Sequence, residues 1–159
     1  MLSQLARSLP IALFCLAVAA LHGCASRTTV PAGADAPAHA VGELAAQVAA
    51  RQVGVPYRYG GDTVAGFDCS GLVQYAYASA GKSLPRTTAA LWQHAGPVAN
   101  SGMRPGDILF FNVDGKMSHV GLYLGDRQFV HAPSTGRTVT IASLDSPFYR
   151  QAFVRAGRP

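Results

Sequence analysis

The chain has 159 residues, of which 13% are charged, and a formal net charge of +5. This length is that of a single domain rather than of a multidomain assembly. The basic balance is compatible with an anionic wall polymer or a membrane surface as a partner, although it also serves solubility alone.

The first predicted segment is a targeting sequence. One positive charge precedes the apolar run Ile11–Leu21, which is too short to span a bilayer and is typical of a signal-peptide core. Gly23 directly before Cys24 resembles a lipobox, the signal for cleavage ahead of a cysteine that receives a lipid. We expect residues 1–23 to be a lipoprotein-type signal peptide and Cys24 to carry the lipid. An ordinary signal peptide cut nearby and an uncleaved anchor are the alternatives.

The residues that follow predict where the protein is held. Ala25 stands where an aspartate would favour retention in the inner membrane. We therefore expect a lipid-anchored protein of the bacterial cell envelope, in the outer membrane and facing the periplasm, which argues against a nucleic-acid partner. Small and polar residues with prolines run to Ala40 without a hydrophobic period, which is typical of a flexible tether. Residues 24–40 are expected to hold the lipidated cysteine and this tether, and residues 41–159 to form the folded domain.

The cysteine count singles out one thiol. Cys15 lies in the segment that is removed and Cys24 is used for the lipid, so the mature protein keeps Cys69 alone and has no internal disulfide. An odd cysteine in an exported protein is either reactive or intermolecular, whereas a buried cysteine of purely structural role is the alternative.

Three helices are predicted in the first part of the domain. Apolar residues at helical spacing indicate a helix from Val41 to about Val53, which the glycines and proline of "GVPYRYGG" end. A second helix starts at Cys69 with Asp68 as its N-cap, and it stops at Gly81. A shorter helix covers residues 87–95.

The hydrophobic period then changes from helical to alternating. Five segments rich in β-branched and aromatic residues are predicted as strands, namely residues 107–112, 118–125, 128–132, 138–142 and 148–154. Helices followed by strands predict an α+β domain in which helices cover one face of an antiparallel sheet of about five to six strands.

Two histidines are predicted to share a face of that sheet. Alternation places His119 and Gly121 on the same face. A three-residue loop at residues 125–127 would set His131 opposite Gly121, diagonal to His119, whereas a two-residue loop would separate the two histidines.

Cys69, His119 and His131 together predict nucleophilic catalysis. The helix N-terminus favours the thiolate of Cys69, His119 can take its proton, and His131 can orient the ring of His119. The backbone N–H of Cys69 and the hydroxyl of Tyr57 or Tyr59 are candidate donors to an oxyanion. Each histidine alone is more often a core or surface residue. A zinc site would lack compact spacing and a fourth ligand, so we expect no metal and no cofactor.

The combined motifs resemble a known group. The stretches "GVPYRYGGDTVAGFDCSGLVQYAY", "LPRTT", "RPGDILFF", "SHVGLYLGDRQFVHAPSTG" and "PFYRQAFVRAGR" are similar to the NlpC family of cell-wall cysteine peptidases, and within it to the lipoprotein branch of murein endopeptidase S (Spr). The resemblance covers roughly residues 41–158 and implies a minimal papain-like fold.

The resemblance also implies roles for single residues. It makes Cys69 the nucleophile, His119 the base and His131 the orienting group. Tyr57 corresponds to the tyrosine that assists the oxyanion, and Asp68 and Ser70 are expected to contact the substrate peptide.

The implied activity is hydrolysis of the D-alanine to meso-diaminopimelate cross-link of peptidoglycan by a monomeric catalytic domain. Cleavage between γ-D-glutamate and diaminopimelate is the close alternative. A non-catalytic lipoprotein that binds peptidoglycan peptides in the same groove is the competing class.

Overall fold

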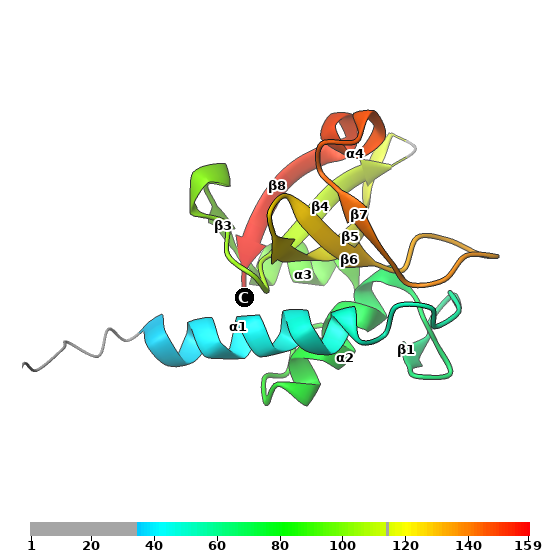
Figure 1. Ribbon diagram of the computed structural model, residues 1–159, viewed down its shortest axis with the longest axis horizontal. Helices are drawn as coiled ribbons and strands as arrows, with labels where there is room; N and C mark the ends of the chain where they lie inside the picture. Colours follow the sequence, from blue (N-terminus) through cyan, green and yellow to red (C-terminus); the bar gives the residue numbers. More distant parts are fainter. Residues whose placement is uncertain (1–34, 114) are drawn as a thin grey trace, which may run out of the picture. The chain divides into compact units, whose positions relative to one another are not determined.

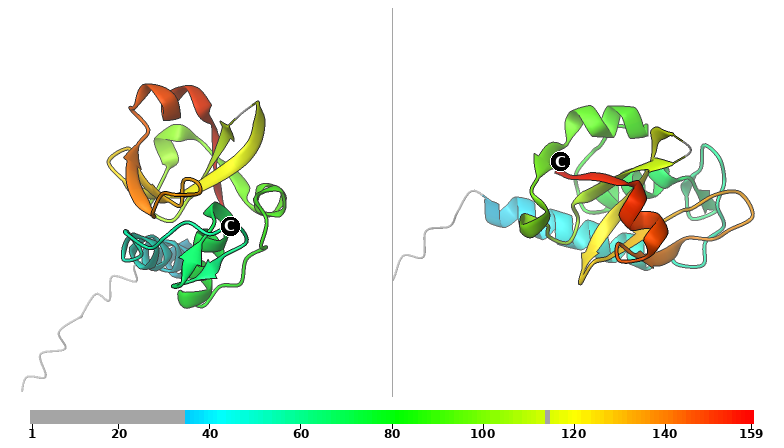
Figure 2. Two further views of the ribbon diagram at one scale, coloured as in Figure 1. Left: turned by 90° about the vertical axis from the view of Figure 1, so that its right-hand side faces the viewer. Right: turned by 90° about the horizontal axis from the view of Figure 1, so that it is seen from above.

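The computed structural model describes residues 35–113 and 115–159 (Figures 1 and 2). The helices of this part of the chain are α1 Asp35–Ala50, α2 Cys69–Ser79, α3 Thr88–His94 and α4 Pro147–Ala152, with a 3₁₀ turn at Asn100–Gly102. The strands are β1 Asp62–Thr63, β2 Gly66–Phe67, β3 Gly96–Val98, β4 Ile108–Val113, β5 Lys116–Gly125, β6 Gln128–His131, β7 Thr140–Ser143 and β8 Phe153–Arg158.

The main sheet has six strands in the order β3-β8-β4-β5-β6-β7. Every neighbouring pair in it is antiparallel. The short strands β1 and β2 form a separate hairpin just before α2. This architecture confirms the predicted α+β class with an antiparallel sheet of five to six strands.

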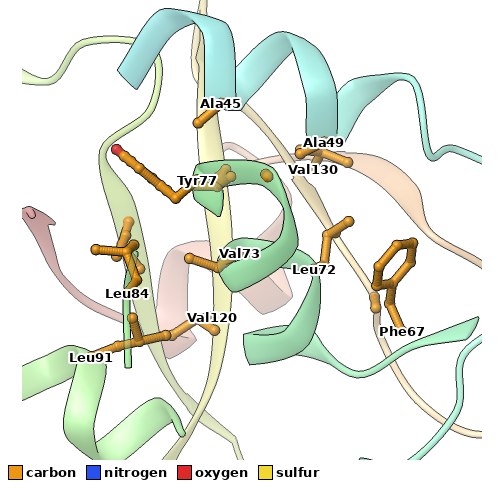
Figure 3. Close-up of a cluster of buried hydrophobic side chains, with 14 of the residues drawn as sticks. Ala45, Ala49, Phe67, Leu72, Val73, Tyr77, Leu84, Leu91, Val120 and Val130 are labelled. Atoms are coloured by element: carbon orange, nitrogen blue, oxygen red, sulfur yellow. The ribbon is translucent and has the colours of Figure 1, made fainter. Parts of the chain in front are cut away.

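A first core cluster joins the sheet to α1, α2 and α3. In Figure 3 Ala45 and Ala49 of α1 face α2, with Leu72 of α2 below Ala49, and Val73 of α2 lies next to Val120 of β5. These five side chains are fully buried. Burying one Val or Leu side chain stabilises a fold by about 1.5–3 kcal/mol, so this cluster fixes α2 on the sheet.

A second core cluster lies on the other face of the sheet, under α4. It contains Leu109 and Phe111 of β4, Phe129 of β6 and Ala152 of α4. In Figure 1 α1 runs below the sheet and α4 lies above it, and the left view of Figure 2 shows the same order. The prediction placed helices on one face only, and α4 adds a cover to the second face.

The first helix begins earlier than predicted. It starts at Asp35, so residues 35–40, which were expected to belong to the tether, are helical. Pro37 does not prevent this because it falls in the first turn, where the backbone N–H groups have no partner within the helix. The tether prediction for residues 25–34 lies outside the described residues.

The second helix confirms the prediction. Asp68 has extended backbone and its carboxylate accepts a hydrogen bond from the N–H of Gly71, as an N-cap does. The helix starts at Cys69, so the thiol lies in its first turn. Losing such a cap costs about 0.5–2 kcal/mol.

The strand predicted at residues 148–154 was wrong. Pro147–Ala152 form α4, and only the residues from Phe153 onward are extended, as β8. Ser146 caps α4 by accepting a hydrogen bond from the N–H of Tyr149, and Pro147 occupies the first helical position. These local signals outweighed the aromatic and β-branched composition on which the strand prediction depended.

No helix within the described residues is long and apolar enough to cross a membrane. The predicted signal peptide and the predicted lipid site at Cys24 lie outside that part of the chain.

Candidate active site

The β5–β6 hairpin brings the two histidines together by a route that the sequence did not predict. Asp126 and Arg127 have φ values of 49° and 58°, the backbone of a tight two-residue turn, and Gly125 pairs with Gln128. The register then shifts by one residue between Tyr123 and Gly125. This bulge restores the register expected from the longer loop, so His119 and His131 share a face.

The two imidazoles are hydrogen-bonded to each other. His119 Nε2 lies 2.8 Å from His131 Nδ1, and His131 Nε2 lies 3.1 Å from the hydroxyl of Tyr149. Phe111 and Phe129 pack against these rings. His119 and His131 are 8% and 1% exposed, so packing holds the row of three polar side chains in place.

Burial keeps both rings neutral. It lowers the pKa of His119 to about 4, and burial together with the charge of His119 lowers the pKa of His131 to about 3. A neutral imidazole carries one N–H. When His131 donates from Nε2 to Tyr149, its Nδ1 accepts from Nε2 of His119, and Nδ1 of His119 is left without a proton. In this tautomer His119 is a base.

The thiol of Cys69 lies against the start of β5. Its Sγ is 3.8 Å from Oγ1 of Thr88 and 3.9 Å from the carbonyl oxygen of Ser118, the residue directly before His119. Burial raises the pKa of Cys69, and the backbone N–H of Val120 only partly offsets this. Burial thus outweighs the effect expected of the helix N-terminus, and the thiol keeps its proton in the free protein.

The carboxylate of Asp68 accepts several hydrogen bonds from within the protein. It accepts them from the N–H groups of Gly60 and Gly71 and from the hydroxyl of Ser70. Arg86 adds two bonds, of 2.9 and 2.7 Å. Burial acts to raise the pKa of Asp68, but Arg86 and the Gly71 amide outweigh it and lower the pKa below its usual value. Asp68 thus ties the glycine loop, the start of α2 and Arg86 together.

Ser70 and Arg86 complete this cluster. Ser70 is buried, and its hydroxyl accepts a hydrogen bond of 2.9 Å from Arg86. Arg86 also donates to the carbonyl oxygen of Gly61. Arg86 belongs to the stretch "LPRTT", and no role was predicted for it from the sequence.

Two pockets flank the residues described above. The Cys69 pocket, of about 450 Å³, is lined by residues that include Tyr57, Asp68, Cys69, Ser70, Arg86 and Thr88. The His119 pocket, of about 630 Å³, is lined by residues that include Val113, His119, Ser134, Arg137, Phe148 and Tyr149.

Tyr57 can serve as a hydrogen-bond donor in the Cys69 pocket. Burial raises the pKa of its hydroxyl, and the neighbouring Cys69 and Asp68 raise it further, so Tyr57 keeps its proton. Tyr59, the other candidate donor, lines the same pocket but is 93% exposed. The structure therefore favours Tyr57.

Tyr149 was missed by the sequence analysis because its segment was assigned to a strand. The Ser-Pro pair at residues 146 and 147 is a helix-start signal that would have placed Tyr149 in a helical turn. Within the described residues no group of three His, Cys, Asp or Glu side chains could hold a metal ion.

Comparison with known proteins places this geometry in a family. Residues 54–158 match the NlpC/P60 family. The chain is 42% identical over 126 residues to the probable endopeptidase YafL of Escherichia coli K12, covering 76% of this chain and 51% of YafL. It is 41% identical over 106 residues to the murein DD-endopeptidase MepS/murein LD-carboxypeptidase of the same strain, covering 66% of this chain and 56% of MepS.

A solved structure shows the same fold. The crystal structure of an NlpC/P60 family protein from Bacillus cereus superposes with a TM-score of 0.68 at 30% identity, over 72% of this chain and 39% of that one. The chain spans about half the length of the curated relatives YafL and MepS. Because the family match extends from residue 54 to residue 158, the chain belongs to the NlpC/P60 family.

Proposed function

We propose that this chain is a cysteine peptidase that hydrolyses the D-alanine to meso-diaminopimelate cross-link of peptidoglycan. The observation that carries the proposal is the hydrogen-bonded row of His119, His131 and Tyr149. The thiol of Cys69 lies 3.9 Å from the carbonyl oxygen of Ser118, the residue directly before His119. The similarity to MepS, a murein DD-endopeptidase, supports this substrate class, and the similarity to YafL, a probable endopeptidase, supports the reaction type.

In the first step Cys69 attacks the carbonyl carbon of the scissile amide. His119 removes the thiol proton as the S–C bond forms, because both groups are neutral at rest. The negative oxygen that develops is bound by the hydroxyl of Tyr57 and by the N–H of Cys69, which lies in the first turn of α2, where backbone N–H groups have no partner within the helix. The C–N bond then breaks and His119 gives the proton to the leaving nitrogen, which leaves a thioester on Cys69.

In the second step water hydrolyses the thioester. His119 takes a proton from the water as its oxygen attacks the same carbon, and the proton returns to sulfur as the S–C bond breaks. His131 and Tyr149 fix the tautomer of His119 in both steps. They are positioning residues.

Asp68 and Ser70 were both expected to contact the substrate peptide, but we assign them different roles. A carboxylate has about four acceptor sites, and Asp68 already accepts five hydrogen bonds. In the free protein Asp68 therefore positions Arg86 and the loop at Gly60. Ser70 and Arg86, which line the same pocket, are proposed to contact the substrate peptide.

Digestion of purified cross-linked muropeptides, followed by mass analysis, tests the activity. The wild type should convert dimers into two monomers, and Cys69→Ala should release nothing. Fragments that end in γ-D-glutamate would show the alternative bond. Binding of sacculi without any new fragment would show a peptide-binding module and contradict the proposal.

Membrane anchoring is a second part of the proposal. Residues 1–23 are proposed as the signal peptide, Cys24 as the lipid site in an outer-membrane protein that faces the periplasm, and the catalytic domain as a monomer. Mass measurement of the mature protein should show an acylated Cys24 at the N-terminus. An unmodified terminus at another residue would contradict it.

A further inference from the structure

The two pockets can be assigned to the two halves of the substrate. The oxyanion donors and the sulfur stay with the acyl group, and Tyr57 and Cys69 both line the Cys69 pocket. The leaving nitrogen must face the group that protonates it, and His119 lines the His119 pocket. The amine half of the substrate therefore occupies the His119 pocket.

The His119 pocket contains one permanently charged side chain among the described residues that line it, Arg137. Its positive charge acts on Tyr149, whose pKa it lowers against the effect of burial. No carboxylate of the described residues pairs with Arg137 within 4.0 Å. A guanidinium placed in this way suits a carboxylate of the ligand, which it can bind through two parallel N–H groups.

The backbone of Arg137 is held in place by the segment that carries Tyr57, a residue of the Cys69 pocket. The N–H of Arg137 donates to the carbonyl oxygen of Ser134, and its own carbonyl oxygen accepts a bond of 2.8 Å from the N–H of Tyr57. The next residue, Thr138, pairs with Pro56. Arg137 is thus fixed relative to Tyr57 although its side chain is exposed.

The two candidate bonds differ in the group beside the leaving nitrogen. In the D-alanine to diaminopimelate cross-link, the carbon that bears this nitrogen also bears a free carboxylate. In a tetrapeptide stem cut after γ-D-glutamate, the corresponding carboxyl is consumed in the amide to D-alanine. A cation in the pocket that holds the leaving group therefore favours cleavage of the cross-link, because only the cross-link has a free carboxylate next to the leaving nitrogen.

We infer that Arg137 binds the free carboxylate next to the leaving nitrogen and so directs this site to the cross-link. This inference rests on the proposed function and names a specificity residue for it. It assigns the His119 pocket to a D-amino acid with an unmodified carboxylate.

A pair of synthetic cross-linked peptides tests the inference, one with that diaminopimelate carboxyl free and one with it as a primary amide. The wild type should show a kcat/KM for the acid about tenfold to a hundredfold above that for the amide, the range of one hydrogen bond to a charged group. Arg137→Gln should cut both peptides equally slowly. Arg51→Gln removes an exposed arginine outside both pockets and should keep the wild-type preference.

Binding to Cys69→Ala separates this inference from the activity itself. Calorimetry with the two uncut peptides should show tighter binding of the acid, and the additional Arg137→Gln change should abolish the difference. If the wild type cuts neither peptide, the proposed activity fails while the binding data still decide the role of Arg137. Equal preference in wild type and Arg137→Gln, in rate and in binding, would overturn the inference.

Discussion

In the proposed mechanism the hydroxyl of Tyr149 accepts a hydrogen bond from His131, which leaves Nδ1 of His119 free to act as a base. Tyr149→Phe removes the partner of His131 Nε2, which lies 3.1 Å away, and leaves the aromatic packing in place. The tautomers of both histidines are then no longer fixed. We expect kcat to fall about tenfold, with KM little changed. This is less than the roughly 10²–10⁴-fold that a proton-transfer group itself contributes, because His119 remains in place.

Nitrogen chemical shifts of the two histidines would report this change directly. In the wild type, His131 should carry its proton on Nε2, and in Tyr149→Phe the proton should be shared between both ring nitrogens. Tyr75→Phe, which removes a hydroxyl outside both pockets, is the matched control. Unchanged shifts and an unchanged kcat in Tyr149→Phe would contradict the role given to Tyr149.

At the scale of the elements, the β5–β6 pair tolerates no side chain at Gly121. A Cβ atom there would lie 2.6 Å from the ring of Phe129, 2.9 Å from the carbonyl oxygen of Val130 and 3.3 Å from Cβ of His131. Gly121→Ala must therefore push β6, and His131 with it, away from β5. We expect a loss of about 1–3 kcal/mol in the free energy of unfolding, together with a loss of activity.

Denaturant unfolding and muropeptide digestion measure the two effects of Gly121→Ala. Gly102→Ala is the control, since its Cβ would approach nothing nearer than Val98, at 4.0 Å. Wild-type stability and activity in Gly121→Ala would show that the hairpin is not held by this close contact.

The elements also show what a sequence can and cannot predict. The start of α2 was predictable because its cap, Asp68, and its apolar stripe are local features of the chain. The shared face of the histidines was predicted from a three-residue loop, whereas the hairpin has a two-residue turn and a bulge next to it. The alternation of the sequence determines which side chains of β5 and β6 must be buried together. The bulge keeps the strand register in which those side chains lie on the same face.

Contacts between distant segments explain the rest of what was missed. The bonds of Arg86 to Asp68, and of Tyr149 to His131, join residues 18 positions apart. No periodicity or spacing reports such bonds. The roles expected for Cys69 and His119 followed from residue type and placement in the sequence, and the family resemblance implied the same roles. Their neutral resting state depends on burial, which only the fold reveals.

For the whole domain, the buried histidines couple folding to pH. Each has a lower pKa in the folded protein, about 4 for His119 and about 3 for His131, than the usual 6.5 of an exposed histidine. Between these values the unfolded chain binds more protons than the folded one, so stability is complete above pH 6.5 and falls as the pH drops toward 4. Each histidine contributes a slope of up to about 1.4 kcal/mol per pH unit in this window.

Urea unfolding from pH 7.5 to pH 4.5 measures this loss. His131→Gln should flatten the slope, whereas His94→Gln, at an exposed position, should keep it. Asp68 does not affect the slope in this pH range. Its pKa in the folded protein is lowered from an already acidic value, so the stability that it contributes is lost only at lower pH. An equal slope in wild type and His131→Gln would mean that the paired imidazoles are not held neutral by burial, and the general-base role of His119 would lose its physical basis.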